Sequence, residues 1–334
     1  MAEYKTIKGT TIQSLASDPP TIAKGQIWYN TTTGALRAAV LSGTWASGPA
    51  FPANISTAAG CGTTTAALSA GGNPQLTTSA IYNGSSWTTN PGLNTGRFGI
   101  ACFGISTAAV AVGGDQNPGD RQITSTETFD GSTWTAGTAY PIVISVGGGL
   151  GTNAAGLVAG GTTSPSFAIT GVTNEYASGT WTAGGALATT SRMGGSVGTQ
   201  TAGLYMAGAT GPDENTSRIT TTQTYDGSTW TNSPISMNNA CNGVGSCGTQ
   251  ALALMYGGRF NSPPNPTNIQ GFTESFDGSS WSATGTLNVA RAYPGRAGTT
   301  NTAALAWGGN PGPAAPDVTE TFSLGSVAET ITTS

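Results

Sequence analysis

A segment that reads as two short strands joined by a tight turn recurs along this chain. TETFDGSTWTAG begins at Thr126, TTQTYDGSTWTNS at Thr221 and FTESFDGSSWSATG at Phe272. Tryptophan marks the interval between copies, at Trp45, Trp87, Trp134, Trp181, Trp230 and Trp281. The period is about 48 residues, and a repeat of that length means that the fold grows by adding similar units. We therefore expect one long repeat domain, although 334 residues would ordinarily suggest two domains.

Each repeat carries the same features in the same order. An apolar segment ends in a glycine pair, at Gly71-Gly72, Gly113-Gly114, Gly160-Gly161, Gly257-Gly258 and Gly308-Gly309, or in its degenerate form, at Ala207-Gly208. A variable loop follows, and then a strand that ends in an aromatic residue, at Tyr82, Phe129, Tyr176, Tyr225, Phe276 and Phe322. Turn sequences such as Asp130-Gly131 come next and favour a hairpin, because Asn, Asp and Gly tolerate the positive φ that matches strand twist.

Six such units predict an all-β fold. An isolated hairpin cannot bury its own apolar face, so the copies must pack on one another, and radial packing of small sheets leaves only short edges exposed. The expected architecture is a six-bladed β-propeller over residues 41–327, with four strands in each blade. The six repeated tryptophans are expected to be structural, since a residue at the same strand position in every blade is typical of packing between blades.

The repeat resembles the kelch, or galactose-oxidase-like, family in residues 41–326. The resemblance lies in the glycine pair, the Glu-x-aromatic pattern and the tryptophan that follows. The glutamates are Glu127, Glu175, Glu274 and Glu320, and the arginines that match the family's first strand are Arg97, Arg192 and Arg291. The family resemblance implies a kelch-like propeller.

The ends of the repeat region suggest how the ring closes. Phe322 is followed by SLGSVAET, which has no tryptophan, whereas LSGTW at 41–45 is a tryptophan strand with no unit before it. The sequence therefore predicts that the N-terminal strand completes the last blade, with Trp45 in the vacant position. In the alternative, Val327 takes that position and LSGTW lies outside the ring.

Composition argues against several classes of function. Charged residues make up 8% of the chain, the net charge is -4, and no basic run occurs, so nucleic-acid binding is not expected. The first twenty residues lack the apolar core of a signal peptide, and no segment has the uninterrupted apolar length that spans a bilayer, so we expect synthesis in a cytoplasm without membrane insertion.

Catalytic and metal chemistry are also not expected. The chain has no histidine, which removes the commonest metal ligand and general base together with the copper chemistry of galactose oxidase. The repeated glutamates suit structural hydrogen bonds, and one aspartate per turn falls short of a calcium site. Four cysteines, Cys61, Cys102, Cys241 and Cys247, have no Cys-x-x-Cys spacing and are expected to be structural. We therefore predict no catalytic residue, no metal and no cofactor.

The loops between the second and third strands vary most among the repeats and leave the blades at equivalent ends. Rigid repeats that gather variable loops on one face commonly use that face for recognition. The candidate ligand-binding residues there are Asp115, Arg121, Asp213, Glu214, Arg218, Arg259 and Phe260. The alternative is that these are ordinary solvated loop residues.

Residues 1–40 do not follow the repeat. Within them, GQIWYNTTTGALRAAV reads as a second kind of hairpin. This segment, with YKTIKGTTIQ and SDPP, resembles the N-terminal region of virion structural proteins of tailed, often marine, phages. The resemblance implies that residues 1–40 attach the protein to the particle, with Ile27, Trp28, Tyr29 and Asn30 as the anchoring residues. Residues 328–334 are expected to be a short C-terminal tail.

These features lead to one main functional hypothesis. We expect a non-enzymatic virion structural protein, a tail or head fibre or a decoration component, whose propeller binds host surface glycan or a neighbouring virion subunit. The expected location is the virion, where the other partners are virion proteins and several copies associate, so that avidity strengthens weak single sites. The alternatives are a cellular kelch-type adaptor that binds a protein partner, and a virion enzyme that degrades glycan.

Overall fold

The computed structural model describes residues 12–22, 25–116, 121–164, 167–260, 268–310 and 317–331. Every regular element in these ranges is a β-strand and none is a helix, so the predicted all-β class is confirmed. The chain forms two compact units, one of residues 44–323 and one of residues 1–43 with 324–334. The expected boundaries at 41 and 327 lie a few residues from these limits.

The larger unit is built from repeated antiparallel sheets with the strand order expected from the sequence. Five sheets have four strands each, and a sixth sheet of six strands contains four in the corresponding order. The first strands of the repeats are β4 (Ala59–Gly62), β8 (Ala101–Ile105), β14 (Gly148–Gly151), β20 (Gly195–Thr199), β25 (Gly245–Gly248) and β30 (Gly295–Ala297). The second strands are β5 (Ala67–Ala70), β9 (Ala108–Val112), β15 (Ala155–Ala159), β21 (Ala202–Met206), β26 (Ala253–Tyr256) and β31 (Ala303–Trp307).

The outer half of each sheet carries the repeated aromatic residues. The third strands are β6 (Ser79–Tyr82), β12 (Thr126–Phe129), β18 (Thr173–Ala177), β22 (Thr222–Tyr225), β28 (Thr273–Phe276) and β32 (Thr319–Thr330). The fourth strands are β7 (Trp87–Asn90), β13 (Trp134–Ala136), β19 (Thr180–Gly184), β23 (Trp230–Asn232), β29 (Trp281–Ala283) and β3 (Ala35–Ser47). Three short ladders lie in the connecting loops and pair β10 (Asp115–Gln116) with β11 (Arg121–Gln122), β16 (Thr162–Thr163) with β17 (Ala168–Ile169), and β24 (Cys241–Asn242) with β27 (Arg259–Phe260).

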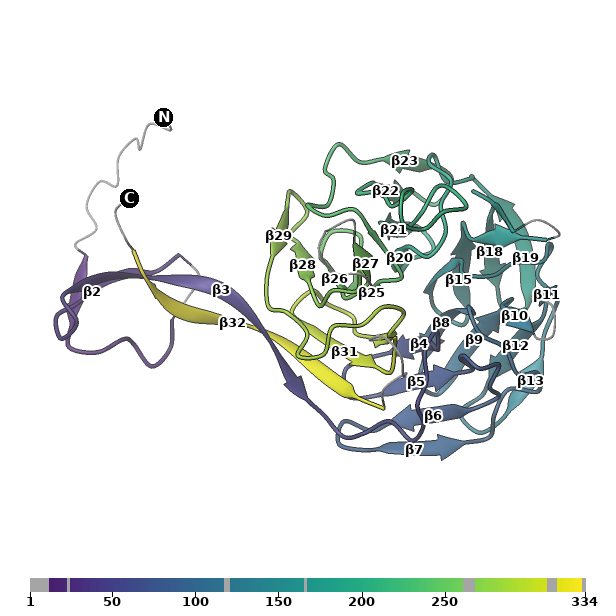
Figure 1. Ribbon diagram of the computed structural model, residues 1–334, viewed down its shortest axis with the longest axis horizontal. Coiled ribbons are helices and arrows are strands. Elements are labelled where there is room, and N and C mark those ends of the chain that lie inside the picture. The colour runs from purple at the N-terminus through teal and green to yellow at the C-terminus, as the bar shows by residue number, and fades with distance from the viewer. Residues whose placement is uncertain are drawn as a thin grey trace. The chain divides into compact units, whose positions relative to one another are not determined.

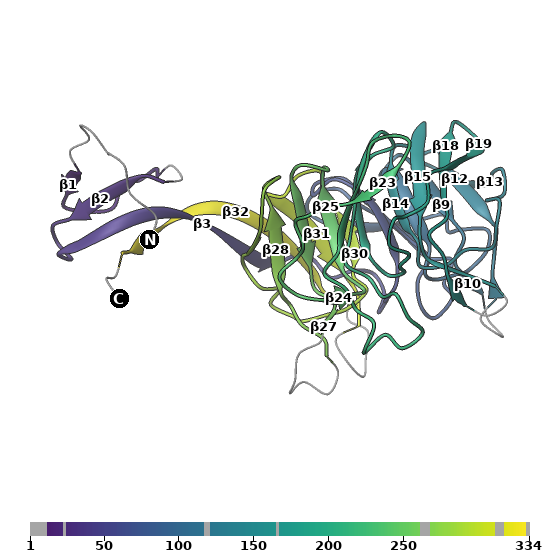
Figure 2. The same cartoon turned by 90° about the horizontal axis from the view of Figure 1, so that it is seen from above.

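The first strands line a central axis. Each contacts the first strand of the next repeat, in the order β4, β8, β14, β20, β25 and β30, and β30 contacts β4 in turn. Figure 1 shows β4, β8, β20 and β25 innermost, with the rest of their sheets extending outward, and Figure 2 labels β14 and β30 in the view turned by 90°. Small sheets arranged radially around an axis form a β-propeller, so the prediction of a β-propeller is confirmed.

The glycine pairs join neighbouring sheets. The second glycine of each pair donates its N–H, at 2.8–2.9 Å, to a carbonyl of the next repeat, and the six acceptors in chain order are Ile55, Arg97, Ile144, Ser191, Cys241 and Arg291. The donor to Ile55 is Gly309, so this series links the last repeat to the first. The same series shows that the match of Arg192 to the first-strand arginine of the family was wrong. Ser191 occupies the position of Arg97 and Arg291, and Arg192 lies one residue later.

Cross-strand aromatic pairs hold the outer strands. The repeated aromatic residue of each third strand packs against a tryptophan of the fourth strand, as in the Phe129↔Trp134 pair, whose ring centroids are 5.1 Å apart. Trp45 and Phe322 make the corresponding contact at 5.2 Å. The Trp45 indole donates to Thr273 of the neighbouring sheet at 3.0 Å, as the Trp230 indole does to Thr173. Trp45, Trp134, Trp230 and Trp281 are buried, while Trp87 and Trp181 are partly buried.

The smaller unit contains β1 (Gln13–Leu15) and β2 (Ile27–Asn30), and β3 and β32 continue into it. Strand β1 pairs in parallel with β2, which pairs antiparallel with β3. Asp18 holds this unit together, because it accepts hydrogen bonds from Trp28 at 2.9 Å and Asn30 at 3.0 Å and pairs with Arg37 at 2.9 Å. Residues 328–330, expected in a separate tail, belong to β32. Most of YKTIKGTTIQ and parts of the loops at 117–120, 261–267 and 311–316 lie outside the described residues.

Candidate functional site

Six residues, one from each repeat, form a rim around the axis just before the first strands. They are Thr57, Gly99, Val146, Met193, Gly243 and Tyr293, and all six have φ between 50° and 65°. Each donates its backbone N–H to the carbonyl of the rim residue in the preceding repeat, at 2.7–3.4 Å, and Thr57 donates to Tyr293. The rim is thus a closed circle of six backbone hydrogen bonds.

This rim stores backbone strain. Left-handed φ is rare for residues other than glycine and is a genuine outlier for β-branched residues such as Thr57 and Val146. Each such residue costs roughly 1–3 kcal/mol and persists only where its surroundings determine its conformation. Here each rim residue is held by two hydrogen bonds, one to the carbonyl of the preceding rim residue and one from the N–H of the following rim residue. The result is a rigid opening that presents four side chains at the axis.

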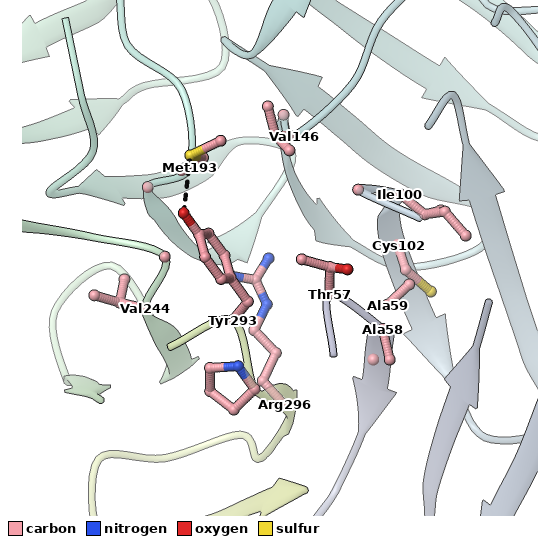
Figure 3. A pocket seen from close by; sticks show the side chains of 16 residues that line it. Thr57, Ala58, Ala59, Ile100, Cys102, Val146, Met193, Val244, Tyr293 and Arg296 are labelled. Carbon is pink, nitrogen blue, oxygen red and sulfur yellow. Dashed lines mark hydrogen bonds between the residues drawn. The ribbon is translucent and has the colours of Figure 1, made fainter. Parts of the chain in front are cut away.

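A cavity of about 90 Å³ lies inside the rim. Figure 3 shows its lining, in which Thr57, Val146, Met193 and Tyr293 surround the opening and Arg296 extends into the space. The Tyr293 hydroxyl lies 3.4 Å from the sulfur of Met193, across the opening. The lining is largely apolar with a few polar groups, which is typical of ligand cavities.

A second cavity of about 270 Å³ lies along the first strands. Gly60, Cys102 and Arg296 line both cavities, so the two meet at this level of the axis. The residues at the equivalent strand position are Gly60, Cys102, Gly149, Ser196, Ser246 and Arg296. The Arg296 guanidinium donates to the hydroxyls of Ser196 and Ser246, at 3.1 Å in each case.

A polar cluster stands beside the rim, and we call it the rim cluster. It consists of Arg192, Glu214, Arg259 and Tyr293. The carboxylate of Glu214 accepts from Arg259 at 3.1 Å and from the Tyr293 hydroxyl at 3.1 Å, and Arg192 lies 3.8 Å from it. Arg259 also sits over the Tyr293 ring, 5.3 Å from its centroid. Burial raises the pKa of Tyr293, and the negative charge of Glu214 raises it further.

Two more predicted residues contact the segments that carry the rim cluster. The Arg218 side chain is buried and donates to the Phe260 carbonyl at 2.9 Å and to Asn215 at 3.0 Å. Phe260 is also buried and packs against Phe272, with the ring centroids 5.2 Å apart. Their positions suit a role in holding the loops that carry Glu214 and Arg259.

The side chains of the other three predicted loop residues have other partners or are exposed. Asp115 is buried and accepts a hydrogen bond from Ser145. Asp213 closes its own loop by accepting from the Asn215 N–H at 2.8 Å and the Thr216 hydroxyl at 3.1 Å. Arg121 is exposed on β11. The structure therefore brings together Glu214, Arg218, Arg259 and Phe260 and leaves Asp115 and Arg121 elsewhere. Asp213 lies next to Glu214, but its carboxylate bonds within its own loop.

Three residues of the site were not predicted as ligand-binding residues. Tyr293 is separated from Glu214 by 79 positions in the chain, and no local pattern joins them. Arg192 was assigned to the family's strand arginine, and its offset of one residue turns it toward the loop of Glu214 instead. Arg296 could have been found from the sequence, because the aligned repeats have Gly, Cys or Ser at its position.

The repeated glutamates have the structural role expected of them. Glu127 accepts from the backbone N–H of Asn94 at 2.7 Å and pairs with Arg97, and both side chains are buried. Glu320 does the same with Asn288 and Arg291. In the described ranges no three His, Cys, Asp or Glu side chains are grouped as a metal site. The four cysteines are unbridged and buried.

The described residues include no helix with the length and apolar character needed to cross a membrane.

Four residues were expected to anchor the N-terminal segment. Ile27 and Tyr29 are 41% and 39% exposed, whereas Trp28 and Asn30 are buried and bonded to Asp18. Trp28 and Asn30 therefore shape the hairpin, and of the four residues only Ile27 and Tyr29 have exposed side chains.

Comparison with known proteins adds support for the fold. No protein-family model matches this sequence, and no curated protein matches it. Among solved structures, the one described as "Structure of YjhT" matches with a TM-score of 0.66 at 13% sequence identity, over 81% of this chain and 95% of that chain. At this level of identity the similarity shows the fold alone, which is a β-propeller.

Proposed function

We propose that this chain is a non-enzymatic structural protein of a tailed-phage virion. In this proposal the smaller unit attaches to the particle, and the propeller binds host surface glycan or a neighbouring virion subunit. The observation that carries the proposal is the apolar surface of the smaller unit. Six large apolar side chains there are 37–50% exposed, namely Ile12, Ile27, Tyr29, Leu41, Val327 and Ile331. Exposed apolar groups concentrated in so few residues are typical of a surface that a partner covers.

We also propose that the propeller has six kelch-type blades and that β3 closes the ring. The circle of six rim hydrogen bonds and the link from Gly309 to Ile55 support six units in a closed series. Strand β3 neighbours β32 in the sheet order, and the contacts of Trp45 repeat those of the other tryptophans. Val327, the alternative occupant, is 37% exposed and falls in the smaller unit. The buried pairs Arg97–Glu127 and Arg291–Glu320 support the kelch type.

The binding face in this proposal is the end of the propeller that carries the rim cluster. Host surface glycan or a neighbouring virion subunit would meet guanidinium, carboxylate and phenol groups held on a rigid rim. A glycosidase of the usual kind needs two positioned carboxylates, whereas Glu214 is the one acid in the rim cluster. This contrast favours binding over hydrolysis.

Imaging of intact particles tests the proposal. The Ser178-Gly179 turn is a suitable insertion point for a small tag, because a side chain added at Gly179 would meet no atom within 4 Å. The tagged protein is expected on purified particles by immunogold microscopy, and an untagged particle preparation is the control. Tagged protein confined to the host cytosol would instead favour a cellular adaptor.

A further inference from the structure

Arg296 is the one charged residue that lines either axial cavity in the described part of the chain. It stands at a strand position where the other repeats have glycine, cysteine or serine. Gly60 is required beside it, because a Cβ there would lie 2.5 Å from the Arg296 carbonyl oxygen. The small residues at this level leave the space that the guanidinium enters.

The partners of Arg296 set it apart from the other arginines of the propeller interior. Arg97 and Arg291 are fully buried, and each is neutralised by a glutamate. Arg296 has only the hydroxyls of Ser196 and Ser246, and no described carboxylate pairs with it. Two of the five guanidinium N–H donors are thus used, and both acceptors are neutral. Arg296 is partly buried. Even partial burial of a charge without a counter-charge is unfavourable, so this arrangement favours an ion of opposite sign.

The cavities provide the room for such an ion. The cavity inside the rim has a volume of about 90 Å³. One water molecule needs roughly 10–15 Å³ of such volume, so the cavity has room for a group of several atoms. A guanidinium presents its donors in a planar fork that matches the two oxygens of a carboxylate. The hydroxyls of Thr57 and Tyr293 at the opening already donate to the Ser56 carbonyl and to Glu214, so the guanidinium is the donor for the anion.

We propose that Arg296 forms an anion-binding site on the propeller axis, which takes a carboxylate group that enters through the rim. The carboxylate can come from a free small acid or from an acidic sugar. The site belongs to the propeller itself and does not depend on whether the protein is part of a virion.

Isothermal titration calorimetry on the full chain tests this site. The probes are acetate, glucuronate and neutral glucose, at an ionic strength kept constant by replacing sodium chloride. We expect saturable binding at one site per chain for at least one of the two acids and none for glucose. Glucuronate binding at least tenfold tighter than acetate would indicate an acidic sugar as the source, and equal binding would indicate a small free acid.

Variants assign the binding to Arg296. Arg296→Met should weaken acid binding at least tenfold, and Arg296→Lys should weaken it less. Arg37→Met removes the same charge and should leave acid binding unchanged, because Arg37 belongs to the smaller unit and pairs with Asp18 there. Thermal unfolding without ligand shows whether Arg296→Met is folded. Its Tm should equal or exceed that of the wild-type chain, because the substitution removes a charge that has no counter-charge. Unchanged binding in Arg296→Met, or saturable binding of neither acid to the wild-type chain, would overturn the proposal.

Discussion

Ala207 occupies a position where the five other repeats have glycine, and it shows what that position requires. The first residue of each pair has φ between 57° and 66°, including Ala207 at 61°. At Gly113 an added Cβ would lie 2.3 Å from the Ile144 carbonyl oxygen. The sequence marks the pairs clearly, but the reason for them, a close approach between neighbouring sheets, becomes visible only in the structure.

The glycine pair yields a prediction about stability. Gly113→Ala should lower the free energy of unfolding by at least about 1–2 kcal/mol, the cost of left-handed φ with a Cβ, because a carbonyl must also move. The opposite change, Ala207→Gly, should leave the stability unchanged or raise it. Urea unfolding followed by tryptophan fluorescence measures both. Equal destabilisation by the two changes would contradict this account.

The turn aspartates stabilise their turns through side-chain hydrogen bonds, and not through the positive φ that the sequence suggested. The positive φ of each turn belongs to the glycine, such as Gly131 at 97°, whereas Asp130 accepts hydrogen bonds from the Ser132 and Thr133 N–H groups at 2.8 Å. Asn83 makes the same two bonds in its repeat. The Thr133 N–H and the Ser132 hydroxyl and N–H lower the pKa of Asp130 to about 2, and similar bonds lower that of Asp277 to about 2. The Thr229 and Ser228 N–H groups likewise hold the pKa of Asp226 well below its usual value.

These shifts predict a dependence of stability on pH. A carboxylate whose pKa is lower in the folded state stabilises the protein above its unfolded pKa, and this contribution is lost as the pH falls toward the folded value. The window is therefore from about pH 4 down to about pH 2. Replacing Asp130, Asp226 and Asp277 together with Asn should flatten the fall of Tm across that window. A triple variant with the wild-type slope would contradict the assignment.

At the scale of elements, strand β2 separates two kinds of residue that the sequence grouped together. Its alternation buries Trp28 and Asn30 and exposes Ile27 and Tyr29. The sequence pattern could predict a hairpin here, but which face is covered depends on Asp18, ten residues before Trp28. Loop residues posed the same difficulty, since Glu214 and Tyr293 meet only because the propeller brings their repeats together.

The exposed face of β2 gives a prediction about attachment. If Ile27 and Tyr29 dock to the particle, then Ile27→Asp combined with Tyr29→Asp should abolish incorporation, because the partner surface would have to bury two charges. Immunoblots of purified particles measure the amount incorporated. A matched control places two aspartates on exposed outer strands of the propeller, at Thr135 and Thr231, and should be incorporated normally. Wild-type levels of the β2 variant would exclude this face.

At the scale of the whole molecule, the repeat determines most of the fold. Its period, glycine pairs and aromatic pairs were sufficient to predict an all-β propeller, because each is a local pattern that recurs. The axial features were harder to predict, since Arg296 departs from the repeat and the rim joins residues up to 236 positions apart, from Thr57 to Tyr293. Departures from the repeat are thus where the candidate site lies.

The six-bladed ring that we propose has β3 as the fourth strand of its last sheet. The hydroxyls of Thr44 on β3 and Ser323 on β32 lie 3.3 Å apart, so a Thr44→Cys, Ser323→Cys variant tests closure directly. After mild oxidation, peptide mass spectrometry should find the two positions joined by a disulfide, and a control that pairs Thr44→Cys with Ser132→Cys should show none. Absence of the 44–323 crosslink in the folded protein would contradict closure by the N-terminal strand.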